Sequence, residues 1–104
     1  MNRRHFLASL SAALMLAFGG ASHAQAQTVT IGVSVSSTGP AASLGIAQKN
    51  TIELLPKTLG GLPVNYVVLD DASDPTAAGK NARRFADADK VDAIIGSTTV
   101  PTSL

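Results

Sequence analysis

The sequence predicts an α/β fold in which an open parallel sheet carries helices on both faces. Three observations lead to this prediction. Runs with the apolar pattern of strands alternate with runs of helical spacing, the connections are short, and glycine, proline or aspartate marks most boundaries. The resulting order is strand, helix, strand, helix, strand, helix. Because crossovers between parallel strands are right-handed, this order places helices on the two faces of one sheet.

The first strand is expected over residues 29–36, where apolar and small side chains alternate. A period of two puts one set of side chains on one face of a strand. The segment 37–40 should end it, because Pro40 has no amide hydrogen for a sheet and Gly39 tolerates any backbone angle. The apolar positions are Val29, Ile31, Val33 and Val35.

A helix should begin near Ser43, after a short loop. Pro56 spoils its last turn by removing a backbone hydrogen bond, so we expect the helix to end near Leu55 or to kink there, before Gly60-Gly61 closes the connection. The residues expected on its apolar face are Ile46, Ala47, Thr51, Leu54 and Leu55.

The second strand is expected over residues 64–69, a near-continuous β-favouring run that is typical of a strand buried on both faces of a parallel sheet. A helix should follow from Asp74-Pro75, since the carboxylate can accept from free amides of the first turn and Pro75 sits where no amide hydrogen is needed. The expected inward stripe is Ala78, Ala82, Phe85 and Ala86, with Lys80, Arg83, Arg84 and Asp87 facing water.

The third strand is expected over residues 91–95 and ends at Gly96. Residues 97–100 then form a polar loop, and Pro101 suits the first position of another helix. Since the sequence stops inside this helical signal, we expect the 104 residues to be a truncated form of a longer chain.

Residues 1–26 show the order of zones that an export signal needs: a basic start, an apolar run from Phe6 to Phe18, and a small, weakly polar end. The apolar run is shorter than the roughly 20 residues that span a bilayer, which predicts a cleavable signal with cleavage before Gln27. The pair Arg3-Arg4 fits either a twin-arginine signal or the ordinary basic start of a Sec signal. Either route takes residues 27–104, one domain at most, out of the cytoplasm.

Removal of this signal changes the chemistry that the chain can offer. Both histidines and two arginines leave, and the formal net charge goes from +1 to −1. That balance argues against a nucleic-acid surface. With no cysteine in the chain and no histidine left, neither a disulfide framework nor a Cys or His metal site is expected.

In open α/β sheets the ligand site lies beyond the carboxyl ends of the strands, which here means residues 36–44, 70–74 and 97–101. The first and third of these loops contain no basic residue. Loops that lead into helices present free amides that can hold a carboxylate without a cation. The hydroxyls of Thr98 and Thr99 could therefore anchor a small anionic or zwitterionic ligand, or they could only cap the next helix.

Several other chemistries have no support in the sequence. Residues 27–104 contain neither the close glycine spacing of a dinucleotide fingerprint nor a phosphate loop, so no cofactor is expected. Asp70, Asp71 and Asp74 could form a cation site, but Asp74 is accounted for as a helix cap and the spacing of a calcium loop is absent, so no metal is expected. Without a Gly-x-Ser-x-Gly elbow, histidine or cysteine, no catalytic residue is assigned and no enzyme activity is expected.

Three motifs occur in the order in which one family carries them: residues 31–42, residues 70–75 (Asp-Asp-Ala-Ser-Asp-Pro) and residues 90–96 (Lys-Val-Asp-Ala-Ile-Ile-Gly). The chain resembles the periplasmic solute-binding proteins of branched-chain amino acid ABC transporters, of the leucine/isoleucine/valine-binding type. The resemblance implies a two-lobed type I periplasmic binding protein, of which residues 27–104 form the first part of the amino-terminal lobe. It implies no catalysis, a periplasmic location, and delivery of a small ligand to a membrane permease.

The same resemblance implies where the ligand would be held. First-lobe contacts in the family lie at the position of Leu44, where an aromatic residue is frequent, and after Gly96, where Ser or Thr is usual at the position of Val100. These two departures leave the ligand class wide: a branched-chain amino acid or a related small carboxylate or amide. The expected ligand-binding residues are Leu44, Ser97, Thr98, Thr99 and Val100.

Two other functions remain open at the level of the sequence. An extracytoplasmic ligand-sensing domain shares this architecture and would be tethered to a membrane signalling domain. A secreted α/β enzyme would need its nucleophile or paired carboxylates beyond Leu104.

Overall fold

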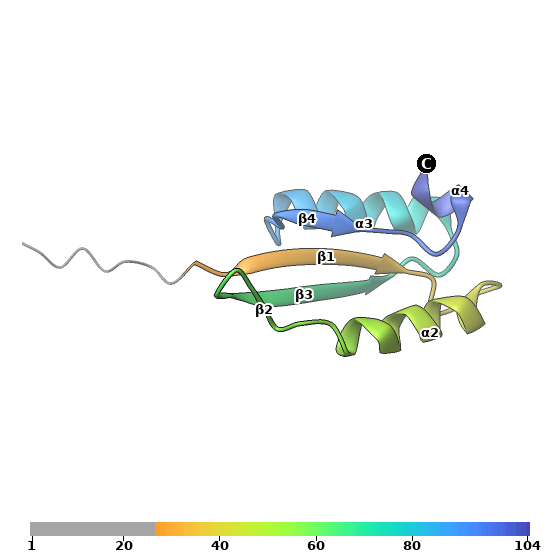
Figure 1. The fold of residues 1–104 in the computed structure, drawn as a ribbon. Helices are drawn as coiled ribbons and strands as arrows, with labels where there is room; N and C mark the ends of the chain where they lie inside the picture. Colours follow the sequence, from red (N-terminus) through yellow and green to blue (C-terminus); the bar gives the residue numbers. More distant parts are fainter. Residues whose placement is uncertain (1–26) are drawn as a thin grey trace, which may run out of the picture.

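The computed structural model describes residues 27–104 and confirms an α/β fold with an open sheet and flanking helices (Figure 1). Three strands are parallel: β1 (Val29–Val35), β3 (Leu62–Asp70) and β4 (Ala93–Ile95). A short fourth strand, β2 (Thr58–Leu59), pairs antiparallel with β3 and makes the sheet mixed. The export signal expected over residues 1–26 lies outside the described residues.

The strand order β2-β3-β1-β4 puts β1 between the other two parallel strands. Val35 pairs with Asp70 at the carboxyl end of β1, and Val33 pairs with Ile95 at the end of β4. The connections after these strands therefore leave the sheet at the same edge. Helix α2 (Ala42–Glu53) lies between β1 and the β2-β3 hairpin in the chain. Helix α3 (Pro75–Asp87) connects β3 to β4, which pairs with β1 on the side opposite β3.

The alternation predicted for the first strand is confirmed. Val33 and Val35 are 1% and 2% exposed and line a cavity together with residues of α2, whereas Gly32 faces α3. Phe85 of α3 is fully buried, and a Cβ added to Gly32 would lie only 2.7 Å from its ring. Gly32 therefore leaves the space that the ring of Phe85 fills, and the two faces of β1 pack against different helices.

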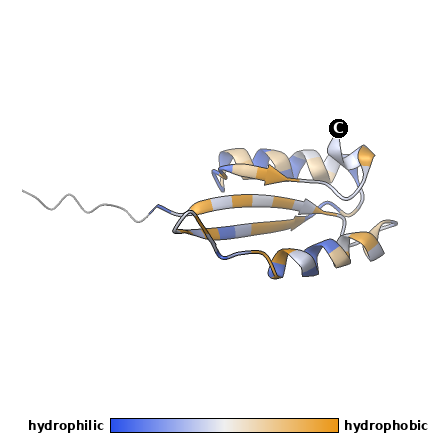
Figure 2. Ribbon diagram, viewed as in Figure 1, coloured by the Kyte–Doolittle hydropathy of each residue, from blue (hydrophilic) through white to orange (hydrophobic). Residues whose placement is uncertain are grey.

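Helix α3 begins as predicted. Asp74 is its N-cap, and its carboxylate accepts hydrogen bonds from the amides of Thr76 (3.3 Å) and Ala77 (3.0 Å). The inward stripe is only half right, because Ala78 and Phe85 are buried but Ala82 and Ala86 are exposed. Figure 2 shows apolar residues concentrated on the strands and hydrophilic residues along α3.

The predicted apolar face of the first helix is only partly right, because Ala47 and Thr51 line the cavity between α2 and the sheet but none of the five expected residues is buried. Ile46 is 48% exposed and Leu54 is 86% exposed, and Ala47 and Thr51 are exposed as well. The buried residue of α2 is Gly45, where an added Cβ would collide with the carbonyl oxygen of Ser36. The helix thus approaches the end of β1 through a glycine, a contact that no apolar spacing indicates. It ends at Glu53, before the expected Leu55.

The connection through Gly60-Gly61 contains structure that the sequence reasoning missed. Both glycines have positive φ, 55° and 80°, and they form the two-residue turn of a hairpin between β2 and β3. Strand β3 starts at Leu62, two residues before the expected start, and ends at Asp70. The expectation that it is buried on both faces is wrong within the described residues, where only Val64 of β3 is buried.

The last strand is shorter than expected, and Asp92, just before it, bonds Thr30 of β1 through both its backbone and its side chain. Its carboxylate accepts from the amide of Thr30 at 2.8 Å, and its own amide donates to the carbonyl of Thr30 at 2.7 Å. Strand β4 then spans Ala93–Ile95, followed by the predicted terminal helix α4 (Val100–Ser103). Within residues 27–104 no helix is long and apolar enough to cross a membrane.

Candidate ligand-binding loops

Three loops meet at the carboxyl edge of the sheet (Figure 1). The first loop (residues 36–41) follows β1, the second loop (residues 71–74) follows β3, and the third loop (residues 96–99) follows β4. Hydrogen bonds accepted by two neighbouring carboxylates, together with those of one threonine hydroxyl, connect the loops. The site expected from the sequence is therefore one connected structure.

Asp71 lies at the centre of these loops and is fully buried. Its carboxylate accepts from the hydroxyls of Ser36 (2.5 Å), Ser34 (3.0 Å) and Ser97, and from the amide of Ser73 (3.0 Å). Burial by itself raises the pKa of Asp71, but these four donors outweigh it and hold the pKa below its usual value. The ionised carboxylate of Asp71 is thus hydrogen-bonded to β1 and to all three loops.

Asp70, one residue earlier, holds the other side of the first loop. Its carboxylate accepts from the hydroxyl of Thr38 (2.5 Å) and from the amides of Ser37 (2.9 Å), Thr38 (3.3 Å) and Ala72 (2.9 Å). Partial burial raises the pKa of Asp70, and the hydrogen bonds from Thr38, Ala72 and Ser37 lower it by more. The pair Asp70-Asp71 therefore secures the first loop from two directions.

Sequence reasoning missed this role of the two carboxylates, because it considered them for a cation site and set that site aside. A signal was present, because hydroxyls at Ser34 and Ser36 alternate along the first strand, and an acidic pair directly follows the neighbouring parallel strand. Ends of paired parallel strands meet, so such groups can hydrogen-bond across them. Among the described residues, no group of three His, Cys, Asp or Glu side chains is placed to hold a metal ion.

The third loop contains Ser97 and Thr98, whose hydroxyls are engaged inside the protein. Ser97 contacts Asp71 and Thr102, the latter at 2.7 Å, and its amide donates to Ser103 Oγ at 3.0 Å. Thr98 Oγ1 accepts from the amide of Ser36 at 2.8 Å and donates to Gln48 Oε1 at 2.7 Å. These two hydroxyls fix the loop against the first loop and α2 and are not oriented as helix caps.

Thr99 and Val100 end the third loop. Thr99 is the N-cap residue of α4, yet its side chain makes no cap hydrogen bond; its Oγ1 lies 2.9 Å from Thr102 Oγ1. Val100 is 70% exposed. Leu44, in the first turn of α2, is 60% exposed. The structure thus places four of the five expected residues in one segment, and Leu44 on the helix that Gln48 links to that segment.

The loops present few polar groups that are still available to a ligand. No basic residue occurs in any of the three loops, and both carboxylates are already supplied with donors. In the part of the chain that the structure describes, the amides of Thr98 and Thr99 make no hydrogen bond. Open amides next to the exposed Val100, together with the exposed Leu44 on α2, suit a small carboxylate with an apolar body.

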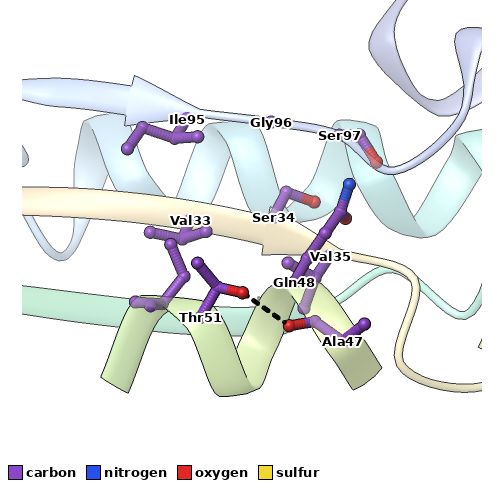
Figure 3. A pocket seen from close by; sticks show the side chains of 10 residues that line it. Val33, Ser34, Val35, Ala47, Gln48, Thr51, Ile95, Gly96 and Ser97 are labelled. Atoms are coloured by element: carbon purple, nitrogen blue, oxygen red, sulfur yellow. Dashed lines mark hydrogen bonds between the residues drawn. The ribbon is translucent and has the colours of Figure 1, made fainter. Parts of the chain in front are cut away.

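A cavity of about 390 Å³ lies beside the loops, between α2 and the strands β1 and β4 (Figure 3). Its walls include Val33, Ile52 and Ile95, which lie below the edge of the sheet. Gln48 and Ser97 line it as well, and Figure 3 shows the Gln48 side chain extending from α2 toward the third loop. The cavity lies against the face of the sheet and reaches the third loop at Gly96 and Ser97.

Comparison with known proteins identifies the fold family. A family model described as periplasmic binding protein matches residues 28–104. The chain belongs to this family. The resemblance noted in the sequence is thereby confirmed, and it extends over almost all of the described residues. No curated protein matches the chain.

Solved structures of the periplasmic binding protein class agree. An extracellular ligand-binding receptor from Rhodopseudomonas palustris HaA2 is 49% identical, with a TM-score of 0.71 over 73% of this chain and 21% of its own. A leucine binding protein from Thermotoga maritima MSB8 is 33% identical (TM-score 0.68; 72% of this chain and 22% of its own). A solute binding protein of an ABC transporter from Rhodopseudomonas palustris BisB5, in complex with 3,4-dihydroxy benzoic acid, is 30% identical (TM-score 0.69; 73% and 22%).

The chain is much shorter than the solved structures that it matches. It spans about a fifth of the length of the structures that it matches. The matched proteins are ligand-binding receptors and solute-binding proteins rather than enzymes. The family and its extracellular relatives imply an extracytoplasmic location.

Proposed function

We propose that this chain forms the first part of the ligand-binding lobe of a solute-binding component of an ABC uptake transporter. The observation that carries the proposal is the third loop, which is held by Asp71, Ser36 and Gln48 and presents open amides at the carboxyl edge of the sheet. A loop fixed this firmly provides a preorganised place for a ligand. Residues 1–26 would direct the protein to the periplasm, where it delivers its ligand to a membrane permease.

The ligand we propose is a small carboxylate with an apolar body. Backbone amides can bind a carboxylate without a cation, and the loops contain no Arg or Lys. Two solved relatives fit this class, since one is a leucine binding protein and the other binds 3,4-dihydroxy benzoic acid. A branched-chain amino acid and an aromatic acid are both members of the class, and the corresponding amides are its nearest variants.

The five expected site residues take different parts in this proposal. Leu44 and Val100 are exposed and would contact the apolar body of the ligand. Thr99 would bind the carboxylate through its amide. Ser97 would act through the backbone that its hydroxyl holds in place, and Thr98 would combine that role with an amide directed at the ligand.

Isothermal titration calorimetry on the mature product of the complete gene tests the proposal. We expect one compound among L-leucine, 3,4-dihydroxybenzoic acid and their amides to bind with a stoichiometry of about one and a Kd in the micromolar range or tighter. For either acid the matched control is its methyl ester, which should bind at least about tenfold more weakly than the acid. Turnover of the compound, or no binding by any member of the panel, contradicts the proposal.

A ligand-sensing domain is the second candidate, favoured by the 49% identical relative that is an extracellular ligand-binding receptor. It would use the same loops and the same ligand class. The coding sequence beyond Leu104 distinguishes the two functions. A membrane-spanning segment followed by a signalling domain would favour the sensor, and a second lobe without such a segment favours the transporter component.

A further inference from the structure

The carboxylate of Asp71 is buried where the three loops meet, a place that apolar side chains usually fill. Burying an ionised group costs free energy that only well-placed hydrogen bonds offset. The one ion pair seen among residues 27–104 joins Arg84 to Asp89, so Asp71 is stabilised by hydroxyls and an amide alone. An apolar side chain would fill the space without this cost, but it could not fix the direction of its neighbours.

The donors to Asp71 come from segments that are distant in the sequence. Ser36 belongs to the first loop and Ser97 to the third loop. A hydrogen bond also joins the first and third loops directly. The amide of Ser36 donates to Oγ1 of Thr98, the residue after Ser97, at 2.8 Å. Thr98 in turn reaches Gln48 of α2, the helix that carries Leu44.

From this arrangement we propose that Asp71 is a positioning residue of the ligand site. Its carboxylate holds Ser36 and Ser97 at a fixed separation and thereby sets where the amides of Thr98 and Thr99 lie relative to Leu44. Asp71 itself is fully buried and does not contact the ligand. The role in ligand binding rests on the proposed function; the role in loop placement does not.

Amide hydrogen exchange followed by NMR tests the loop placement in the mature product of the complete gene. In Asp71→Asn the charge that gathers the hydroxyls is gone, so we expect the amide hydrogen of Ser36 to exchange at least about tenfold faster. Ser97→Ala removes the contacts of the Ser97 hydroxyl with Asp71 and Thr102, and the buried charge keeps its donors Ser36, Ser34 and the amide of Ser73. Ser97→Ala should increase the exchange rate of the Ser36 amide by a smaller factor than Asp71→Asn. It replaces Asp71→Asn as the test variant if that variant does not fold.

The matched control is Asp74→Asn, which removes a carboxylate three residues away while asparagine still caps α3. It should change the exchange of Ser36 by less than about twofold. Unchanged exchange at Ser36 in both test variants overturns the proposal. An acceleration spread evenly over β1 and α3 also overturns it, because that pattern reports general destabilisation.

Calorimetry with L-leucine and 3,4-dihydroxybenzoic acid tests the link to binding. For the compound that the wild type binds, Asp71→Asn should weaken the Kd at least about tenfold under conditions where the variant remains folded. Faster exchange at Ser36 with an unchanged Kd overturns the positioning role. If the wild type binds neither compound, the proposed function fails for this ligand class, and the exchange rates alone then decide whether Asp71 positions the loops.

Discussion

Asp70 and Asp71 are neighbours in the sequence but lie in different surroundings. Asp71 is fully buried and Asp70 is exposed, yet each collects four hydrogen bonds. A cation site at these acids has no support in the sequence, and the pairing of β3 with β1 brings the hydroxyls of serine and threonine to the two carboxylates. The identity of the acids could be read from the sequence; their hydrogen-bond partners depend on register.

The lowered pKa of Asp71 leads to a prediction about stability and pH. A carboxylate whose pKa is lower in the folded state than its ordinary 3.8 stabilises the protein above that value, and this contribution is lost as the pH falls through the folded pKa. Asp71→Asn should therefore unfold at a lower temperature than the wild type near neutral pH, and the difference should shrink below about pH 4. Asp87→Asn on the exposed side of α3 is the control. A difference that persists unchanged in acid would contradict the prediction.

Val100 offers a substitution that changes binding without changing the fold. It is 70% exposed, and threonine has nearly the same shape, so Val100→Thr should leave the unfolding temperature unchanged. The family resemblance places a hydroxyl at this position in amino-acid binders. We expect the affinity for L-leucine to rise about tenfold, measured by calorimetry, while that for 3,4-dihydroxybenzoic acid changes little. Equal changes for both compounds would show that the position does not select between them.

At the scale of elements, strands and the capped helix could be predicted, whereas the contact faces of helices could not. Period-two alternation and the Asp74-Pro75 start are local signals, and both are confirmed. The face of α2 depends on Gly45, which approaches the carbonyl of Ser36 and leaves Ile46 and Leu54 exposed. A glycine used for close packing leaves no apolar signature. The hairpin at Gly60-Gly61 was missed because β2 is only two residues long.

The two helical glycines, Gly45 and Gly79, allow the same substitution to be tested in opposite environments. An added Cβ at Gly45 collides with backbone, so Gly45→Ala should destabilise by about 1–3 kcal/mol despite the better helix propensity of alanine. At Gly79 the nearest atom is 4.0 Å away, at the flexible end of Arg83, so Gly79→Ala should stabilise by up to about 1 kcal/mol. Thermal unfolding of the mature protein measures both. The same sign for both variants would contradict this account of α2.

At the scale of the whole molecule, the described residues leave the β4 edge of the sheet without a neighbouring strand. Strand β4 is last in the order β2-β3-β1-β4, and its Ile94 and Ile95 are 50% and 46% exposed. The sequence predicted that the strand over residues 64–69 is buried on both faces, and this burial fails at β3, where neighbouring apolar surface would be needed to complete it. The fold family could be read from three local motifs; the extent of burial could not, since it depends on what packs against them.

An open apolar edge predicts self-association when residues 27–104 are produced alone. Unpaired strand edges template pairing with another chain, and inward or edge charges prevent it. Sedimentation velocity should show association that grows with concentration, and Ile94→Lys should reduce it. Glu53→Lys, on α2, is the control for added positive charge. A monomer at every concentration in the unmodified segment would contradict the prediction.

The contact between Phe85 and Gly32 constrains how this protein can diverge. The phenyl ring occupies the volume where a side chain at position 32 would begin, so position 32 cannot gain a side chain while position 85 is phenylalanine. A lineage that acquires alanine or serine at position 32 needs a smaller residue at position 85 first, and a lineage that keeps phenylalanine must keep glycine. Across homologues the two positions should therefore covary, although 53 residues separate them in the chain.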